Sequence, residues 1–74
     1  MMSPKLPQMT GAEVISFLEK HQFRCVRQKG SHVIMKNNRG EAVVIPLHKG
    51  KILGVGILKA ILKSVGIAED EVQK

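Results

Sequence analysis

His32 is the residue of this sequence with the clearest capacity for chemistry. It follows Gly30 and Ser31, and it has lysines on both sides, Lys29 and Lys36. A histidine can take up or release a proton near neutral pH, and a lysine ammonium group can hold a phosphate. RNA carries its own nucleophile, the 2′-hydroxyl, so its cleavage requires chiefly proton transfer and positive charge around the reacting phosphate. These residues permit a slow ribonuclease, and a surface histidine without a catalytic role is the open alternative.

The sequence contains no other recognisable catalytic or metal-binding motif besides His32. The three histidines are too scattered for a recognised metal-ligand pattern. Gly54-Val55-Gly56 lacks the spacing and the Lys-Ser/Thr ending of a phosphate-binding loop. Cys25, the only cysteine, is expected to pack as a small hydrophobic residue rather than to act as a nucleophile. The sequence therefore predicts neither a metal site nor a cofactor.

Positive charge is concentrated in the middle of the chain. The formal net charge is +6, and between Lys20 and Lys63 the only acidic residue is Glu41. A basic middle with acidic margins favours a polyanionic partner, with nucleic acid as the first candidate and an acidic protein as the second. An ordinary basic face is the third interpretation. The two aromatic residues, Phe17 and Phe23, argue against a module that stacks single-stranded bases on rings.

Apolar spacing and turn signals predict one domain, residues 1–74, with the element order α-β-β-β-α. Thr10 and Glu13 have the spacing of a capping box at the start of a helix, and Gly66 followed by Ile67 suits the end of another. Three strands joined by short turns predict an antiparallel sheet with both helices on one face, an α+β fold. The predicted segments are an extended lead-in over 1–9, a helix over 10–21, a half-buried strand over 23–28, strands over 33–35 and 41–45, a loop over 47–53, a helix from 54 to 66, and a short acidic turn over 68–72.

Alternation along the second strand divides its residues between two faces of the sheet. Val33 and Met35 are expected to face the helices, which places His32 and Lys36 on or near the open face. Ile34 would suit the core as well, so the assignment of faces is left to the structure.

The second helix is predicted to have an apolar face and a basic edge. Lys59 and Lys63, one turn apart, form that edge. The apolar positions at helical spacing are Val55, Leu58, Ile61, Leu62 and Val65.

Nothing in the sequence predicts export or membrane insertion. The N-terminal residues lack the apolar core of a signal peptide, no apolar run reaches membrane-spanning length, and a single cysteine permits no internal disulfide. The cytoplasm is therefore the expected compartment.

Several segments, in order along the chain, resemble one protein family. They are Thr10–Ile15 with Phe23, Arg27–His32, Val44–His48, and Gly56–Leu62 running on to Val65–Ile67. In this order and spacing they resemble the HicA (YcfA-like) family of mRNA interferase toxins over nearly the whole chain. The most specific element is Arg27-Gln28-Lys29-Gly30-Ser31-His32.

The resemblance implies a fold like the double-stranded-RNA-binding domain, cleavage of mRNA, and neutralisation by a HicB-type antitoxin. It implies that His32 matches the catalytic histidine of the family, and that a free monomer forms a hetero-oligomer with the antitoxin. Two positions depart from the pattern. Many relatives have a second polar residue or histidine where this chain has Val33, and the second helix often opens with a basic-Gly-Thr segment where this chain has Val55-Gly56-Ile57.

The expected function is that of a metal-independent endoribonuclease toxin with His32 as the catalytic residue. The expected RNA contacts are Lys29, Ser31, Lys36, His48, Lys59 and Lys63. Solvated surface roles are the alternative for His48 and for the two helix lysines. Two other functions stay open. A non-catalytic double-stranded-RNA-binding module would bind RNA in a salt-sensitive way without cleaving it, and a basic protein-interaction domain would bind an acidic partner but no RNA.

Overall fold

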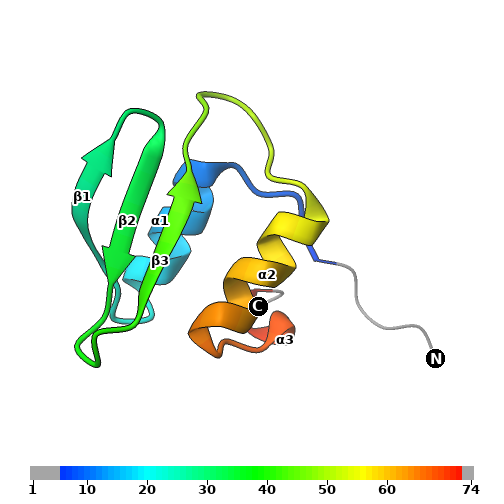
Figure 1. Cartoon of the computed structure of the whole chain (residues 1–74). Coiled ribbons are helices and arrows are strands. Elements are labelled where there is room, and N and C mark those ends of the chain that lie inside the picture. Colours follow the sequence, from blue (N-terminus) through cyan, green and yellow to red (C-terminus); the bar gives the residue numbers. More distant parts are fainter. Residues whose placement is uncertain (1–5, 73–74) are drawn as a thin grey trace.

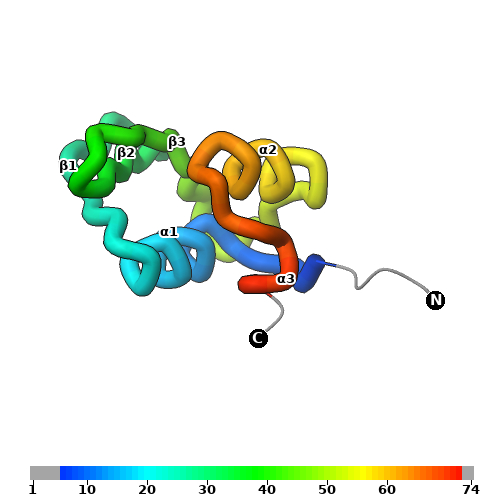
Figure 2. Tube along the Cα trace, turned by 90° about the horizontal axis from the view of Figure 1, so that it is seen from below, coloured from blue at the N-terminus to red at the C-terminus, as the bar shows by residue number. Residues whose placement is uncertain are grey.

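Three antiparallel strands form one sheet, and two helices pack against one face of it (Figures 1 and 2). The computed structural model describes residues 6–72. The strand order is β1-β2-β3, as expected for a meander, and the predicted α+β fold is confirmed. The elements are α1 (Gly11–Glu19), β1 (Arg24–Lys29), β2 (His32–Lys36), β3 (Ala42–Pro46), α2 (Val55–Val65) and α3 (Glu69–Val72).

The helix ends follow the predicted capping chemistry. The Glu13 amide donates to Thr10 Oγ1 at 3.2 Å, and the Thr10 amide donates to Glu13 Oε1 at 2.8 Å. Such a cap contributes roughly 1 kcal/mol. At the end of α2, Gly66 has a φ of 71°, and the Ile67 amide donates to the Leu62 carbonyl at 3.0 Å. The capping box and the Schellman-type ending are therefore both confirmed.

The core lies between the sheet and the two longer helices. Val33 and Met35 of β2 are buried, and Ile34 is only half-buried on the other face, so the predicted assignment of faces is confirmed. The remaining buried side chains of the strands and of the two longer helices are Val43, Ile45, Val14, Leu18, Leu58, Ile61, Leu62 and Val65. The prediction for Val55 was wrong: it is 49% exposed, because the first turn of α2 lies away from the sheet (Figure 1).

Strand β1 is more exposed than its sequence predicted. All six of its residues are exposed, because α1 and α2 both pack against β3 and leave β1 as an uncovered edge. The prediction that Cys25 packs inside is therefore wrong, since this residue is exposed. The strand also contains a β-bulge. Cys25 pairs with Met35 and Arg27 pairs with Ile34, which leaves Val26 as the extra residue.

The segment before α1 is anchored to the fold over its described part. Leu6 is buried in the core, and the Leu53 amide donates to the Met9 carbonyl at 2.8 Å. Thr10 and Ile52 form an isolated antiparallel bridge. This segment therefore pairs with the loop between β3 and α2 and holds that loop close to the start of α1. The remainder of the predicted lead-in, 1–5, lies outside the described residues.

Gly11 permits the close approach of α1 to the end of β3. A Cβ atom built on Gly11 would lie 2.5 Å from the carbonyl oxygen of Pro46. We expect Gly11→Ala to lower the free energy of unfolding by about 1–3 kcal/mol, since the backbone must shift to admit the methyl group. Gly56→Ala is the matched control, because a Cβ there meets nothing within 4 Å. It should raise stability by about 0.5 kcal/mol through helix propensity, as urea unfolding of both variants would show. Equal effects in the two variants would contradict this account of Gly11.

Candidate functional site

His32 stands at the end of the sheet formed by the β1–β2 turn. It is the first residue of β2 and lies between two neighbours, Lys29 of β1 and Pro46 of β3. Directly opposed residues in an antiparallel sheet share a face, with Cβ atoms about 4.5–5.5 Å apart. The imidazole is exposed, and within residues 6–72 it makes no hydrogen bond or ion pair. His32 is thus accessible to a ligand, with an ammonium group as its cross-strand neighbour.

The turn that carries His32 has two residues, Gly30 and Ser31. Gly30 has a φ of 59°, a conformation that glycine adopts without strain. The Gln28 side-chain amide donates to the Gly30 carbonyl at 3.1 Å. The Leu47 amide donates to the Ser31 carbonyl, which ties the chain after β3 to the same turn. These contacts hold the backbone of the turn in place, and the turn fixes the position of His32.

The uncovered side of the sheet forms a continuous surface, the open sheet face. Lys36 lies on it with His32, but four residues further along β2, which is about 13 Å at strand spacing. Lys36 therefore provides a second basic position at the other end of β2 from Lys29. By register and alternation the open sheet face consists of Arg24, Arg27 and Lys29 of β1, His32, Ile34 and Lys36 of β2, and Ala42, Val44 and Pro46 of β3.

Arg24 and Arg27 belong to this surface although sequence reasoning did not select them. In a regular strand, residues three apart point to opposite faces. The bulge at Val26 cancels that alternation, so Arg24 pairs with Lys36 while Arg27 pairs with Ile34. Bulges often re-aim side chains next to functional sites. The sequence holds no direct signal for the bulge, which explains why sequence reasoning did not place Arg24 and Arg27 on one face.

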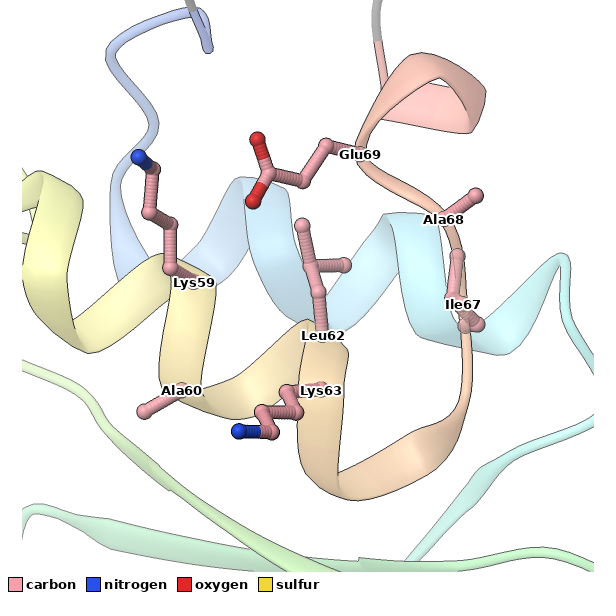
Figure 3. Close-up of a pocket in the computed structure, with 7 residues that line it drawn as sticks. All are labelled: Lys59, Ala60, Leu62, Lys63, Ile67, Ala68 and Glu69. Carbon is pink, nitrogen blue, oxygen red and sulfur yellow. The ribbon is translucent and has the colours of Figure 1, made fainter.

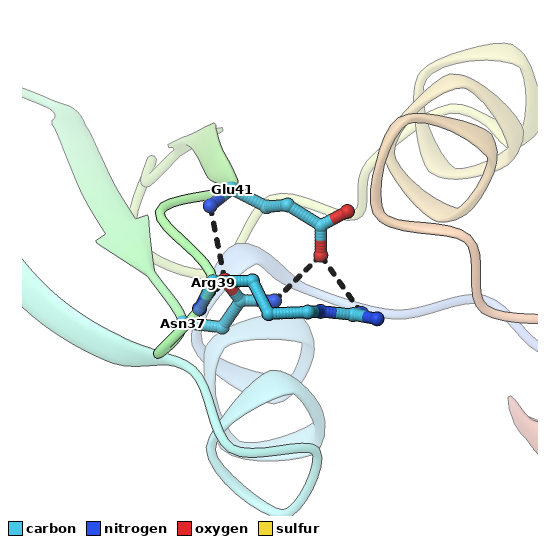
Figure 4. A network of polar contacts seen from close by, with 3 residues as sticks. All are labelled: Asn37, Arg39 and Glu41. Atoms are coloured by element: carbon cyan, nitrogen blue, oxygen red, sulfur yellow. Dashed lines mark hydrogen bonds and ion pairs between the residues drawn. The ribbon is translucent and has the colours of Figure 1, made fainter.

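Glu41, the acid nearest to this surface in the sequence, is occupied in the β2–β3 turn (Figure 4). Its Oε1 accepts from Asn37 Nδ2 at 2.6 Å and from Arg39 Nη2 at 2.9 Å. Asn37 Oδ1 in turn accepts the Arg39 and Glu41 amides, both at 3.0 Å. The carboxylate therefore neutralises Arg39 and leaves the bases of the open sheet face without an acidic partner among the described residues.

His48 lies at the same end of the sheet as His32. It follows Pro46, which pairs with His32, by two residues, and it is exposed. With Lys49 it lines a pocket of about 390 Å³ between the loop after β3 and the start of α1. The structure thus brings His48 to the end of the sheet where His32 and Lys29 lie.

Lys59 and Lys63 are separated from that end of the sheet. Both are exposed on α2, which begins at the loop after β3 and runs toward the opposite end of the sheet (Figure 1). They line a pocket of about 440 Å³ together with Ile67 and Glu69. In Figure 3 the two lysines extend in different directions, and Glu69 extends to the same side as Lys59. Both lysines thus lie on the exposed side of α2, one turn apart, at the same pocket.

Residues 6–72 contain neither a cluster of metal-binding side chains nor a membrane-spanning helix. No three His, Cys, Asp or Glu side chains gather into a group that could hold a metal ion. In the same part of the chain, none of the helices combines the length and the apolar character that a membrane span requires. His21 has a local role: its Nδ1 lies 3.1 Å from the Phe17 carbonyl oxygen, and its Nε2 lies 3.8 Å from Glu71 Oε1.

The three-stranded sheet, with helices on one face and a basic open face, defines an α+β domain with an arrangement like that of double-stranded-RNA-binding domains. A comparison with protein families matches residues 11–67 to the family described as HicA toxin of bacterial toxin-antitoxin. The chain therefore belongs to the HicA toxin family. A search among curated proteins finds no match to it.

Membership of this family has two direct consequences. The chain is a toxin of a toxin–antitoxin system, and an antitoxin is its natural partner. The matched range includes every residue of the open sheet face and both α2 lysines.

Proposed function

We propose that this toxin is a metal-independent endoribonuclease that cleaves mRNA, with His32 as its catalytic residue. The observation that carries the proposal is the exposed pair of His32 and Lys29 at the end of a basic sheet face. It places a proton-transfer group beside a fixed positive charge on a surface that a polynucleotide can reach. The family match supports a toxic activity.

The reaction proposed is transfer of the phosphoryl group to the neighbouring ribose oxygen. His32 takes the proton of the 2′-hydroxyl while the 2′ oxygen forms a bond to phosphorus. The bond from phosphorus to the 5′ oxygen of the next nucleotide breaks, and that oxygen takes a proton from water or from the imidazolium. Lys29 stabilises the negative charge that develops on the phosphoryl oxygens. The products are a 2′,3′-cyclic phosphate and a 5′-hydroxyl.

The remaining RNA contacts follow from where each residue lies. Lys29 holds the reacting phosphate, and Lys36 holds a phosphate further along β2, given the distance between them. Ser31 lies in the turn and orients His32 or the substrate. His48 contacts the RNA at the end of the sheet where His32 lies. Lys59 and Lys63 offer secondary phosphate contacts on α2, at a pocket that Glu69 also lines.

The antitoxin proposed is of the HicB type. A partner that covers the exposed His32 would exclude RNA, so binding of antitoxin and of RNA should compete. In this proposal the free toxin is a cytoplasmic monomer and the neutralised form is a hetero-oligomer.

Analysis of the cleaved ends tests the proposed reaction. We expect RNA incubated with the purified toxin to carry 5′-hydroxyl and cyclic phosphate ends, because the nucleophile is the 2′-hydroxyl. The activity should persist in excess EDTA, and an RNA with 2′-O-methyl groups should resist cleavage. Ends with a 5′-phosphate, or loss of activity in EDTA, would rule out this route. RNA binding without cleavage would instead favour the non-catalytic module.

A further inference from the structure

We propose that the open sheet face binds single-stranded RNA along its sugar-phosphate backbone, with Arg24 and Arg27 holding phosphates beyond the one at His32. This rests on the ribonuclease function proposed above and adds the class of RNA and the path that it follows. The path runs from the β1–β2 turn, where His32 lies, to the β2–β3 turn, where Arg24 and Lys36 pair.

The basic residues of β1 form a single line along this path. Lys29 lies opposite His32, Arg27 opposite Ile34, and Arg24 opposite Lys36. Their three partners on β2 are spaced two residues apart, so the line covers four residues of strand, or about 13 Å. The bulge at Val26 makes it continuous, because in a regular strand Arg24 and Arg27 would point to opposite faces. A line of this length accommodates more than one phosphate of a polynucleotide.

The charges on this line are available to a ligand. Arg24, Arg27 and Lys29 are all exposed, and none forms an ion pair within residues 6–72. Arg24 Nη1 donates to Asn38 Oδ1 at 3.3 Å, a contact that orients the guanidinium toward the β2–β3 turn without neutralising it. No acidic residue occurs at any of the nine positions of the open sheet face. The phosphates of an RNA strand would therefore be attracted to positive charge along the whole path.

The arrangement fits one strand rather than a duplex. Duplex RNA is recognised by domains that span about 16 base pairs and contact two successive minor grooves. Here the basic side chains of β1 lie in one row. The neighbouring row, on β2, has Ile34 at its centre, and Val44 of β3 lies opposite Ile34. This apolar pair can contact sugars or the edges of unpaired bases. Because the face carries no Phe, Tyr or Trp, most of its contacts are with the RNA backbone, and it should select only weakly among base sequences.

Salt-dependent binding tests the path. The probe is a fluorescent oligouridine, measured with His32→Ala protein so that it is not cleaved. Arg24→Gln/Arg27→Gln should make the negative slope of log K against log salt concentration shallower by about 1.4, since each phosphate contact to a single strand contributes about −0.7. That change corresponds to about 25-fold weaker binding at 0.1 M salt, with no difference extrapolated to 1 M. Lys20→Gln, an exposed charge at the end of α1 and off the face, should leave the slope unchanged.

Each other outcome would overturn the proposal. An unchanged slope in the double variant, or an equal change in Lys20→Gln, would mean that the arginines hold no phosphate. Tighter binding of an RNA duplex of the same length than of oligouridine would refute the single-strand class. Loss of antitoxin binding with intact RNA binding would identify the face as a protein-docking surface. The result is separable from the catalytic assignment, which fails if His32→Ala cleaves RNA as fast as the unaltered protein does.

Discussion

Replacement of His32 by alanine should abolish toxicity and lower the rate of RNA cleavage by a factor of about 10²–10⁴, the usual contribution of a positioned proton-transfer group. The fold should be unaffected, because the imidazole is exposed and makes no hydrogen bond within the described residues. Growth after induced expression, together with the cleavage rate of the purified variant, measures the effect. Antitoxin binding should persist, since the loss concerns one exposed ring.

His48→Ala is the matched control for this experiment. His48 is also exposed and lies at the same end of the sheet, but in the loop after β3 rather than opposite Lys29. We expect its removal to weaken RNA binding modestly and to leave the chemical step in place. Full toxicity of His32→Ala would refute the catalytic assignment. If the cleavage rate falls as much in His48→Ala as in His32→Ala, His48 in the loop takes part in the proton transfer.

Replacement of Met35 by alanine should lower the stability of the fold strongly. Met35 is fully buried, at 0% exposure, where the sheet faces the helices. Removal of such a side chain typically costs about 2–5 kcal/mol, and small domains have only about 5–15 kcal/mol in total. Each kcal/mol shifts the Tm of a domain of this size by about 4–8 °C. We therefore expect a fall in Tm of at least about 8 °C, measured by circular dichroism.

Ile34→Ala provides the comparison on the opposite face. Ile34 is adjacent to Met35 in the sequence, but it lies half-exposed on the open sheet face against Val44. Its loss removes the apolar cross-strand contact with Val44, worth about 0.2–1 kcal/mol. The Tm should therefore fall much less than in Met35→Ala. Similar losses in the two variants would mean that the open face is covered, which would contradict its assignment as an accessible surface.

The sequence by itself determined the local structure around these positions. Capping depends on residues within one turn of each other, so Thr10 with Glu13 and Gly66 with Ile67 marked two helix ends correctly. Strand alternation has a period of two, so it separated Val33 and Met35 from His32. The resemblance to the HicA family depended on the order of such local segments, and the family match confirmed it.

Other features depended on which surfaces meet in three dimensions. Cys25 and Val55 have the residue types of a core, yet both are exposed, because the helices pack against β3 and leave β1 and the start of α2 uncovered. The separation of Lys59 and Lys63 from the end of the sheet likewise followed from the direction of α2. No short-range pattern encodes these distances, because they arise from packing between segments far apart in the chain.

The bulge at Val26 shows this division most clearly. Sequence spacing places Arg24 and Arg27 on opposite faces of a strand, and only the pairing with β2 shows that they share one. Register is decided by the partner strand and by the burial of Val33 and Met35 against the helices. The sequence thus selected His32, Lys29 and Lys36 as candidate site residues. The tertiary structure decided which bases accompany His32 on the open sheet face, because one unpaired residue in β1 realigned the strand.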